Sequence, residues 1–298
     1  MNMKDAKFKL DFIGIGVPRS GTTWIHNILK DHPQICMSST KETNFFNDDN
    51  EYNKGISYYQ EKYYKHCDNN QIRGEFHPGY FNYSNSADRI KNNFPNSKVI
   101  ICLRNPVDRA YSHFSKHELK GKKHLNKFSD ITKVIPNIYI DNSTYSSKIK
   151  KYISVFGKNN ILILFYNDLI EDPQNFSKKI YNFLGVSSDF TSPKIDRKIN
   201  FTGERRAKFL FLNSIIFQTE RIFIKNKFLN KYVLPIIKKL RIHNLRKLIF
   251  RLNMDLKNKK TDKKEIDEET KQKLIEIFNP DIEELEKITG KDLSFWKQ

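Results

Sequence analysis

The chain has 298 residues and a formal net charge of +19, from 53 lysines and arginines against 34 aspartates and glutamates. With 38% hydrophobic residues, including 23 phenylalanines and 14 tyrosines, it can build a buried core, which excludes wholesale disorder. The length fits one α/β domain, and the positive charge predicts an anionic partner: a nucleotide, a nucleic acid, a sulfated or phosphorylated glycan, or a membrane surface.

Three short apolar runs have the character of buried parallel strands. They cover 10–17, 98–103 and 160–165. Helical spacing of apolar residues predicts helices at 22–30, 56–64, 87–93, 106–117, 144–156 and 175–184, and two more after residue 270 that are separated at Pro280. Strands alternating with helices at these intervals predict an α/β fold, with one parallel sheet covered by helices on both faces.

The composition changes after about residue 200. Residues 205–260 contain 16 lysines or arginines and two acidic residues, which gives this segment +14 of the net charge. The segment is also rich in apolar residues, so we expect amphipathic helices with a cationic outer face, packed on the sheet. We expect a single domain over 1–298, with an α/β core at 10–206 and a helical extension at 207–298.

The three cysteines, Cys36, Cys67 and Cys102, are odd in number and form no CxxC pair. This pattern signals neither a disulfide framework nor a zinc site, and it favours a reducing compartment. An apolar run of about 18 residues, the length that a membrane span needs, is absent from the sequence. The residues before the first expected strand alternate charge with hydrophobicity, unlike a signal peptide. We therefore expect a cytoplasmic protein.

The strongest local signal is the segment from Gly14 to Trp24, GIGVPRSGTTW. It runs from a strand through a glycine-containing turn into a helix N-terminus, where backbone N–H groups and the helix dipole bind phosphate. A dinucleotide fingerprint would need glycine in place of Arg19, and a Walker A motif would need lysine in place of Thr22. The loop therefore predicts a phosphate site in which Arg19 contacts the bridging oxygen of a group being transferred.

This segment resembles the 5′-phosphosulfate-binding loop of the sulfotransferases that use 3′-phosphoadenosine 5′-phosphosulfate (PAPS). In that family a later strand and helix carry an arginine and, eight residues on, a serine, which both bind the 3′-phosphate. This sequence has Arg104 at the end of VIICLR and Ser112 in NPVDRAYSHF. Because ligands bind at the carboxyl ends of parallel strands, we expect Arg104 to lie on the same side of the sheet as the opening turn.

Residues 41–46, KETNFF, are similar to the Lys-Glu-x-x-Phe-Phe segment of the glycan-directed sulfotransferases, whose glutamate deprotonates the acceptor. A hydroxyl group needs such a positioned base before it can attack at neutral pH. The resemblance implies that Glu42 is the general base and that the acceptor is a carbohydrate.

Residues 74–81, GEFHPGYF, resemble the segment that borders the acceptor in the same relatives. Phe76 replaces the usual lysine, so His77 is the candidate for the missing cation, or the acceptor is bound differently. Glu75 is a second candidate for the base, and only geometry can decide between it and Glu42.

Further residues are assigned to donor binding by the resemblance. Tyr166, in the Tyr-x-Asp-Leu turn, and Trp24 are expected near the adenine, although buried aromatic residues commonly serve packing. Arg206 is expected to close over the 3′-phosphate, with Arg205 as the alternative. The expected donor-binding set is Arg19, Ser20, Gly21, Thr22, Thr23, Trp24, Arg104, Ser112, Tyr166 and Arg206, and the expected catalytic set is Arg19, Glu42 and His77.

The resemblance covers residues 10–206 and, more weakly, 270–298. It implies a PAPS-dependent sulfotransferase with the three-layer fold of the P-loop-containing nucleotide hydrolases, PAPS as donor, PAP as product, no metal, and a glycan hydroxyl or amine as acceptor. The alternatives are a P-loop nucleotide kinase, disfavoured by Thr22, and a basic protein that binds nucleic acid or a membrane surface. We expect no nucleic-acid partner, and peripheral membrane contact remains open for residues 205–260.

Overall fold

The computed structural model describes residues 8–119, 125, 127–134, 137–196, 206–207, 209, 254–255 and 266–298. The chain forms two compact units. The first comprises residues 1–110, 140–199 and 272–298, and the second comprises 111–139 and 200–271. Most of the basic segment at 205–260 lies outside the described residues. The division into one domain with a core and an extension therefore stays a prediction.

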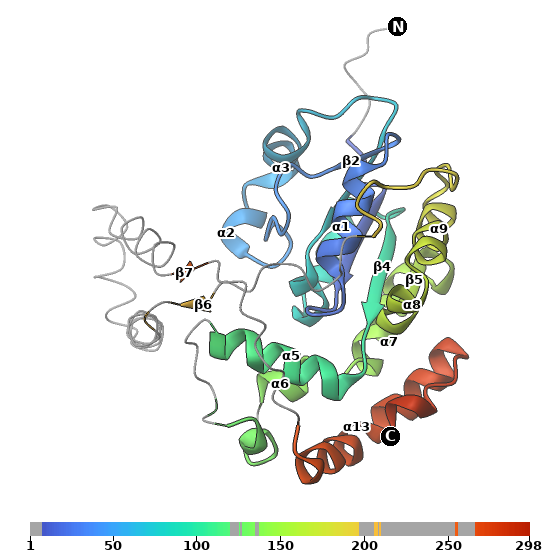
Figure 1. Cartoon of the computed structure of the whole chain (residues 1–298). Helices are drawn as coiled ribbons and strands as arrows, with labels where there is room; N and C mark the ends of the chain where they lie inside the picture. The colour runs from blue at the N-terminus through green and yellow to red at the C-terminus, as the bar shows by residue number, and fades with distance from the viewer. Residues whose placement is uncertain are drawn as a thin grey trace, which may run out of the picture. The chain divides into compact units, whose positions relative to one another are not determined.

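A five-stranded parallel sheet forms the centre of the first unit, in the order β2-β3-β1-β4-β5 (Figure 1). The strands are β1 (Phe12–Gly16), β2 (Ile35–Met37), β3 (Ile72–Phe76), β4 (Lys98–Leu103) and β5 (Ile161–Phe165). After β1 the chain proceeds to β2 on one side of the sheet, and after β4 it proceeds to β5 on the other. The carboxyl ends of β1 and β4 therefore form the switch point at which such sheets bind ligands.

Helices cover both faces of this sheet. On one face, α1 (Thr22–Asp31), α8 (Tyr166–Glu171) and α9 (Pro173–Leu184) share a buried cluster with the strands, which includes Phe12, Ile28, Ile100, Cys102 and Phe176. Because side chains alternate along a strand, the equally buried Ile13, Val99 and Ile101 point to the opposite face. There α4 (Ser86–Asn93) and α7 (Ser146–Phe156) contact each other. The three-layer α/β fold expected from the sequence is confirmed.

The remaining elements are shorter or lie outside the sheet. In the first unit they are α2 (Asp49–Tyr52), α3 (Gly55–Tyr64) and the 3-10 turns η1 (Pro78–Asn82), η3 (Lys158–Asn160) and η5 (Ser294–Trp296). The second unit contains η2 (Phe128–Thr132) and an antiparallel pair, β6 (Arg206–Ala207) and β7 (Met254–Asp255). Three helices span the boundary between the units: α5 (Pro106–Leu119), α6 (Ile138–Asp141) and α13 (Glu268–Thr289). None of the helices in the described ranges combines the length and apolarity required to cross a bilayer.

Pro280 does not separate two helices, as the sequence predicts, but lies inside α13. Proline removes one helical hydrogen bond and commonly ends or kinks a helix. Here apolar side chains on both sides of the proline are buried: Leu274, Phe278, Ile282 and Leu285. Their spacing of three or four residues places them on one face, so tertiary packing keeps the helix continuous across the proline.

The cysteine prediction is wrong for one pair, because Cys36 and Cys67 are joined by a disulfide. The two residues are 31 positions apart, and this spacing carries no recognisable motif. Cys102 is the free cysteine and is fully buried in β4. A disulfide is typical of oxidising compartments, so the cytoplasmic location stays a prediction.

Candidate active site

The loop at 17–21 joins β1 to α1 at the carboxyl end of the central strand. Its backbone is left-handed at Arg19, with a φ of 77°, and at Gly21, with a φ of 76°. For a residue other than glycine this conformation is uncommon and costs roughly 1–2 kcal/mol. Gly21 is the N-cap of α1 and offers no side chain to the first N–H groups, which have no acceptor within the helix. The loop therefore presents backbone donors that suit an anion.

Ser20 adds a hydroxyl group to this loop. The residue is fully buried, and its Oγ has no hydrogen-bond partner among the described residues. A buried polar atom without a partner is rare, because it has lost its hydrogen bonds to water and gained none in return. An anionic group held at the loop would supply the partner, so the residues here fit the phosphosulfate that the sequence predicts.

Arg104 follows β4 and reaches the same loop. Its Nη1 donates a hydrogen bond of 3.2 Å to the carbonyl oxygen of Arg19, and its side chain is 16% exposed. Its guanidinium carbon lies 4.8 Å from the ring centre of Tyr166, which is a cation–π distance. The prediction that residue 104 lies on the same side of the sheet as the opening turn is confirmed.

Tyr166 and Leu169 of α8 border the loop from the end of β5. A Cβ atom at Gly21 would lie 2.6 Å from Leu169 Cδ2 and 3.3 Å from Tyr166 Cδ2, so glycine is the residue that fits at this positive φ. Burial raises the pKa of the Tyr166 hydroxyl, and the charges of Arg104 and Arg19 oppose this shift. The charges of both arginines therefore affect the Tyr166 hydroxyl. Residues that follow β1, β4 and β5 thus lie close together at this loop.

Trp24 and Phe76, which the sequence places near the donor and the acceptor, both lie in the core. Trp24 is 5% exposed, meets the Phe176 ring edge-on at 5.9 Å, and donates its Nε1–H to the Ile195 carbonyl at 3.4 Å. Phe76 is fully buried and covers Gly14, where a Cβ atom would lie 2.1 Å from its ring. Packing accounts for these contacts, and stacking of Trp24 on an adenine stays a prediction.

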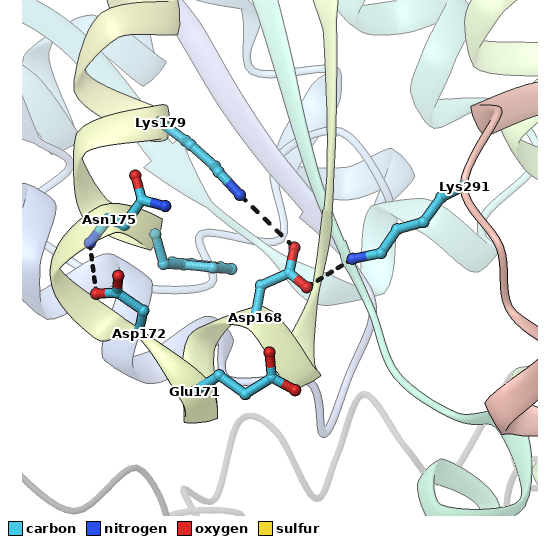
Figure 2. Close-up of a pocket in the computed structure, with 7 residues that line it drawn as sticks. Asp168, Glu171, Asp172, Asn175, Lys179 and Lys291 are labelled. Atoms are coloured by element: carbon cyan, nitrogen blue, oxygen red, sulfur yellow. Dashed lines mark hydrogen bonds and ion pairs between the residues drawn. The ribbon is translucent and has the colours of Figure 1, made fainter.

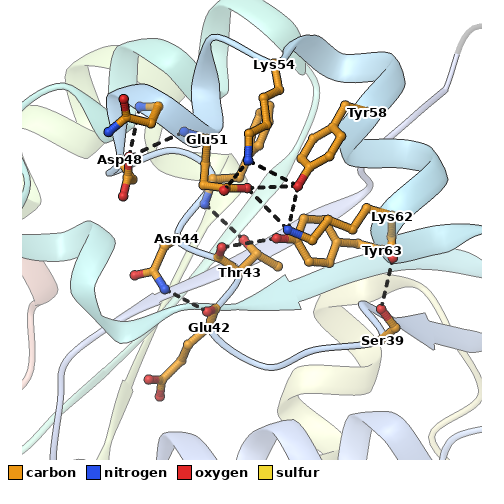
Figure 3. Close-up of polar contacts among 12 residues, drawn as sticks. Ser39, Glu42, Thr43, Asn44, Asp48, Glu51, Lys54, Tyr58, Lys62 and Tyr63 are labelled. Carbon is orange, nitrogen blue, oxygen red and sulfur yellow. Dashed lines mark hydrogen bonds and ion pairs between the residues drawn. The ribbon is translucent and has the colours of Figure 1, made fainter. Parts of the chain in front are cut away.

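Glu42 lies in the segment between β2 and α2. Its φ is 64°, and with Arg19 and Asn44 it is one of the three non-glycine residues of the described ranges that have a positive φ. Its N–H donates to the Phe76 carbonyl at 3.3 Å. The carboxylate is 52% exposed and lies 2.5 Å from Lys41 Nζ. In Figure 3 the side chain points away from the polar network of α2 and α3, so an accessible carboxylate stands on a constrained backbone.

Glu75, the alternative base, is fully buried near the end of β3. Its Oε2 accepts hydrogen bonds of 2.8 Å from both Thr43 Oγ1 and the Tyr59 hydroxyl, and Thr43 Oγ1 also lies 3.0 Å from the Tyr80 hydroxyl. Burial raises the pKa of the Glu75 carboxyl, and hydrogen bonds from Tyr80, Thr43 and Tyr59 oppose this shift. The network fixes the segment that carries Glu42 to β3.

His77 is 5% exposed, and both of its ring nitrogens are engaged. Nδ1 accepts a hydrogen bond of 3.0 Å from the Gly79 N–H, so Nε2 carries the proton and donates to Asn44 Oδ1 at 2.8 Å. Burial lowers the pKa of His77 to about 4, although Glu42 acts to raise it. Asn44 Nδ2 donates to the Glu42 carbonyl at 3.1 Å. A neutral His77 thus supports the turn that carries Glu42, and its direct catalytic role stays a prediction.

His26, on α1, is a residue that the sequence pattern did not single out. It is 7% exposed, and its Nδ1 has no partner among the described residues. Burial and the charges of Lys41 and Lys30 lower its pKa to about 4, while Glu42 acts to raise it. The charges of the segment around Glu42 therefore affect the pKa of this histidine. The available signal was its position one turn into the expected phosphate-binding helix.

Asp168, in the Tyr-x-Asp-Leu turn, holds α8 in place (Figure 2). Its Oδ1 accepts a hydrogen bond of 2.6 Å from Lys291 Nζ, and its Oδ2 lies 3.9 Å from Lys179 Nζ. Lys291 also lies 4.3 Å from the centre of the Phe165 ring. The segment after α13 is thereby attached to the start of the helix that begins with Tyr166.

Four other residues that are expected to bind the donor lie within the described ranges. Thr22 and Thr23 begin α1, Thr22 buried and Thr23 exposed. Ser112 lies in the part of α5 that belongs to the second unit, and Arg206 lies in β6. Arg205 lies outside the described residues. The donor contacts of all these residues stay predictions.

A strand, a turn with backbone donors and a helix, with an arginine at the end of the neighbouring strand, match the arrangement that the sequence predicts for a sulfotransferase. The family model for the sulfotransferase domain matches residues 9–294. The chain therefore belongs to the sulfotransferase-domain family.

Two curated relatives and one solved structure illustrate the similarity. The membrane-associated sulfotransferase kil1 of Dictyostelium discoideum is 40% identical over 117 residues, which are 38% of this chain and 24% of that protein. The bifunctional heparan sulfate N-deacetylase/N-sulfotransferase 4 of Mus musculus is 27% identical over 197 residues, 60% of this chain and 22% of that protein. The matches thus span about a quarter or less of these relatives.

The crystal structure of a sulfotransferase from Alicyclobacillus acidocaldarius aligns with a TM-score of 0.67 at 20% sequence identity. The alignment covers 98% of this chain and 100% of that one. At this identity the likeness concerns the fold alone, and it agrees with the three-layer architecture of the described residues.

Proposed function

We propose that this protein transfers the sulfuryl group of PAPS to a hydroxyl or amine of a carbohydrate. The observation that carries the proposal is the position of Arg104, whose guanidinium lies at the loop that contains Arg19 and Ser20, a serine whose hydroxyl has no partner in the described part of the chain. Two cationic side chains and an orphaned donor at the ends of β1 and β4 suit a nucleotide that carries two anionic groups.

Different residues of this chain have separate roles in an in-line transfer. Glu42 takes the proton of the acceptor as the acceptor forms its bond to sulfur. Arg19, Ser20 and the N–H groups at the start of α1 stabilise the charge that develops on the leaving phosphate. Arg104 holds the 3′-phosphate. A sulfuryl group carries less negative charge than a phosphoryl group, so these cationic and dipolar groups suffice without a metal ion.

The contacts favour Glu42 over Glu75 as the base. A general base must reach the proton that it removes. The Glu42 carboxylate is 52% exposed, whereas Glu75 is fully buried and accepts hydrogen bonds from Thr43 and Tyr59. Glu75 is thus suited to hold the segment of the base in position.

Two observations support the proposal of a carbohydrate acceptor. The segment KETNFF resembles the base segment of the glycan-directed enzymes, and the Mus musculus relative is named for heparan sulfate. The specificity of an enzyme is determined by the loops around its site and not by its fold, so the acceptor must be tested directly.

The test is transfer of radiolabelled sulfate from PAPS to a panel of glycans, lipids, phenols and peptides, with and without EDTA. We expect label in a glycan and equal turnover in EDTA. Transfer to phenols or lipids alone would refute the carbohydrate acceptor. Absence of transfer together with magnesium-dependent ATP turnover would support the kinase alternative.

Cytoplasmic location and membrane contact by residues 205–260 stay predictions.

A further inference from the structure

Cys36, His66 and Cys67 form a cluster of metal-ligating groups that the transfer mechanism does not use. Cys36 lies in β2, and His66 and Cys67 follow the end of α3. The two sulfur atoms and one imidazole nitrogen all lie within 4.8 Å of one another. We propose that these three residues form a zinc site whenever the disulfide between the two cysteines is reduced.

His66 already stands at the distance of a third ligand. Its Nε2 lies 3.4 Å from Cys36 Sγ and 4.0 Å from Cys67 Sγ. In a tetrahedral site with Zn–S of about 2.3 Å and Zn–N of about 2.0 Å, a sulfur and a nitrogen ligand lie about 3.5 Å apart and two sulfurs about 3.8 Å apart. The Cα atoms of the cysteines are 5.7 Å apart, so rotation of the side chains separates the thiolates without moving the backbone.

Solvent reaches one side of the cluster. Cys36 is buried, Cys67 is half-buried and His66 is exposed. Three protein ligands with one exposed side leave the fourth position of a tetrahedral ion to water. In the disulfide form Nε2 of His66 lies 3.2 Å from the Met37 carbonyl, to which it donates. Metal binding transfers that proton to Nδ1, on a ring that is open to water.

The redox step needs a reductant, and a dithiol supplies it. The dithiol gives two electrons and two protons to the Cys36–Cys67 bond, which breaks into two thiols, and the dithiol leaves as its own disulfide. Binding of Zn²⁺ then converts the thiols to thiolates and releases both protons to the solvent. The disulfide and the zinc complex are therefore alternative states of one site.

The position of the site gives it a structural role. β2 leads directly into the segment that carries Glu42, and α3 carries Tyr59, whose hydroxyl bonds to Glu75. A disulfide joins these two elements under oxidising conditions, and a zinc ion joins them under reducing conditions. The fold thus keeps this connection in either environment.

The test is metal binding by the full chain, reduced with a dithiol and then freed of it without air. We expect the reduced protein to take up one equivalent of Zn²⁺, to show thiolate-to-metal charge transfer with Co²⁺, and to lose both properties on oxidation. Cys36→Ser and His66→Ala should each weaken Zn²⁺ binding by about 100-fold or more, since even outer-shell losses cost roughly 10- to 100-fold. Cys102→Ala is the matched control and should bind as the wild type does.

Alkylation of the reduced wild type gives a second readout that needs no variant. Zn²⁺ should protect Cys36 and Cys67 from an alkylating reagent, as located by peptide mass spectrometry. Equal alkylation with and without Zn²⁺, or uptake that Cys102→Ala reduces as much as Cys36→Ser does, would overturn the proposal.

Discussion

The guanidinium of Arg104 donates a hydrogen bond to the backbone carbonyl of Arg19, a residue 85 positions earlier in the chain. This contact joins the end of β4 to the turn that follows β1. Arg104 thereby supports the loop through Nη1, while its Nη2 lies 4.0 Å from Asp108 and its guanidinium carbon lies over the Tyr166 ring. Arg19 and Arg104 thus bring two cationic side chains to the ends of the neighbouring strands β1 and β4.

Arg104→Ala should weaken the binding of PAP. Loss of a largely buried charged contact costs about 2–5 kcal/mol, which is at least roughly 30-fold in affinity. Isothermal titration calorimetry measures the change. Arg73→Ala is the matched control, because Arg73 lies in β3 toward the opposite edge of the sheet. Equal affinity of wild type and Arg104→Ala would remove Arg104 from the donor site.

Arg19→Gly should lower activity without lowering stability. Turnover should fall by about 10² or more, the scale of losing one transition-state donor. The stability should stay level or rise by about 1 kcal/mol, because glycine adopts the positive φ of residue 19 without strain. Sulfate transfer and thermal unfolding measure the two effects. Turnover equal to that of the wild type would exclude Arg19 from the mechanism.

Glu42→Gln should bind PAP normally and turn over slowly, because the amide keeps the shape of the side chain but cannot take a proton. We expect a loss of 10²- to 10⁴-fold in kcat, the typical contribution of general base catalysis. Glu61→Gln, an exposed site in α3, is the control. If Glu42→Gln retains full kcat, the base is a different group and Glu75 is the next to test.

Glu75→Gln should change how stability depends on pH. Burial raises the pKa of Glu75 in the folded protein, so its contribution to stability is complete below the ordinary glutamate pKa and is lost as pH rises through the raised value. The difference in unfolding free energy between variant and wild type should therefore favour the variant increasingly from acid to neutral pH. Urea unfolding at several pH values measures it. A difference that is constant with pH contradicts the raised pKa.

His77→Asn should change the pH dependence of stability in the opposite direction. Burial lowers the pKa of His77 to about 4, so the neutral ring contributes stability above about pH 6.5 that is lost as pH falls toward 4. The wild type should lose on the order of 3 kcal/mol through this group across that range, and the variant should lack this loss. His26 has a similarly lowered pKa and keeps its own contribution in both proteins. Parallel pH profiles of the two proteins would contradict the assignment.

The sequence predicted β1, β4 and β5 but missed β2 and β3, which lie on the other side of β1. β1, β4 and β5 are continuous apolar runs, which identify buried parallel strands. β2 has three residues, and β3 contains Arg73, Gly74 and Glu75, so neither shows such a run. Both strands are fixed by pairing with their neighbours, and pairing over long separations leaves no local pattern.

The site was predictable where a backbone motif defines it. The turn with Arg19 can be read from strand, turn and helix signals, and the role of Arg104 after β4 follows from the family resemblance. The contacts of Asn44 with His77 and Glu42, and those of Thr43 with Glu75, depend on how β3 lies beside the segment after β2. Such contacts follow from tertiary structure, and the sequence therefore left the choice between Glu42 and Glu75 open.

Lys291 can anchor α8 only after nearly the whole chain has been translated. Lys291 reaches Asp168 across 123 positions, and Asn105, next to Arg104, donates to the Trp296 carbonyl across 191. A growing polypeptide therefore contains every motif residue of the first unit long before the supports of Tyr166 and Arg104 have left the ribosome. Fragments that stop short of residue 290 would keep the signature of the family yet lack these supports of Tyr166 and Arg104.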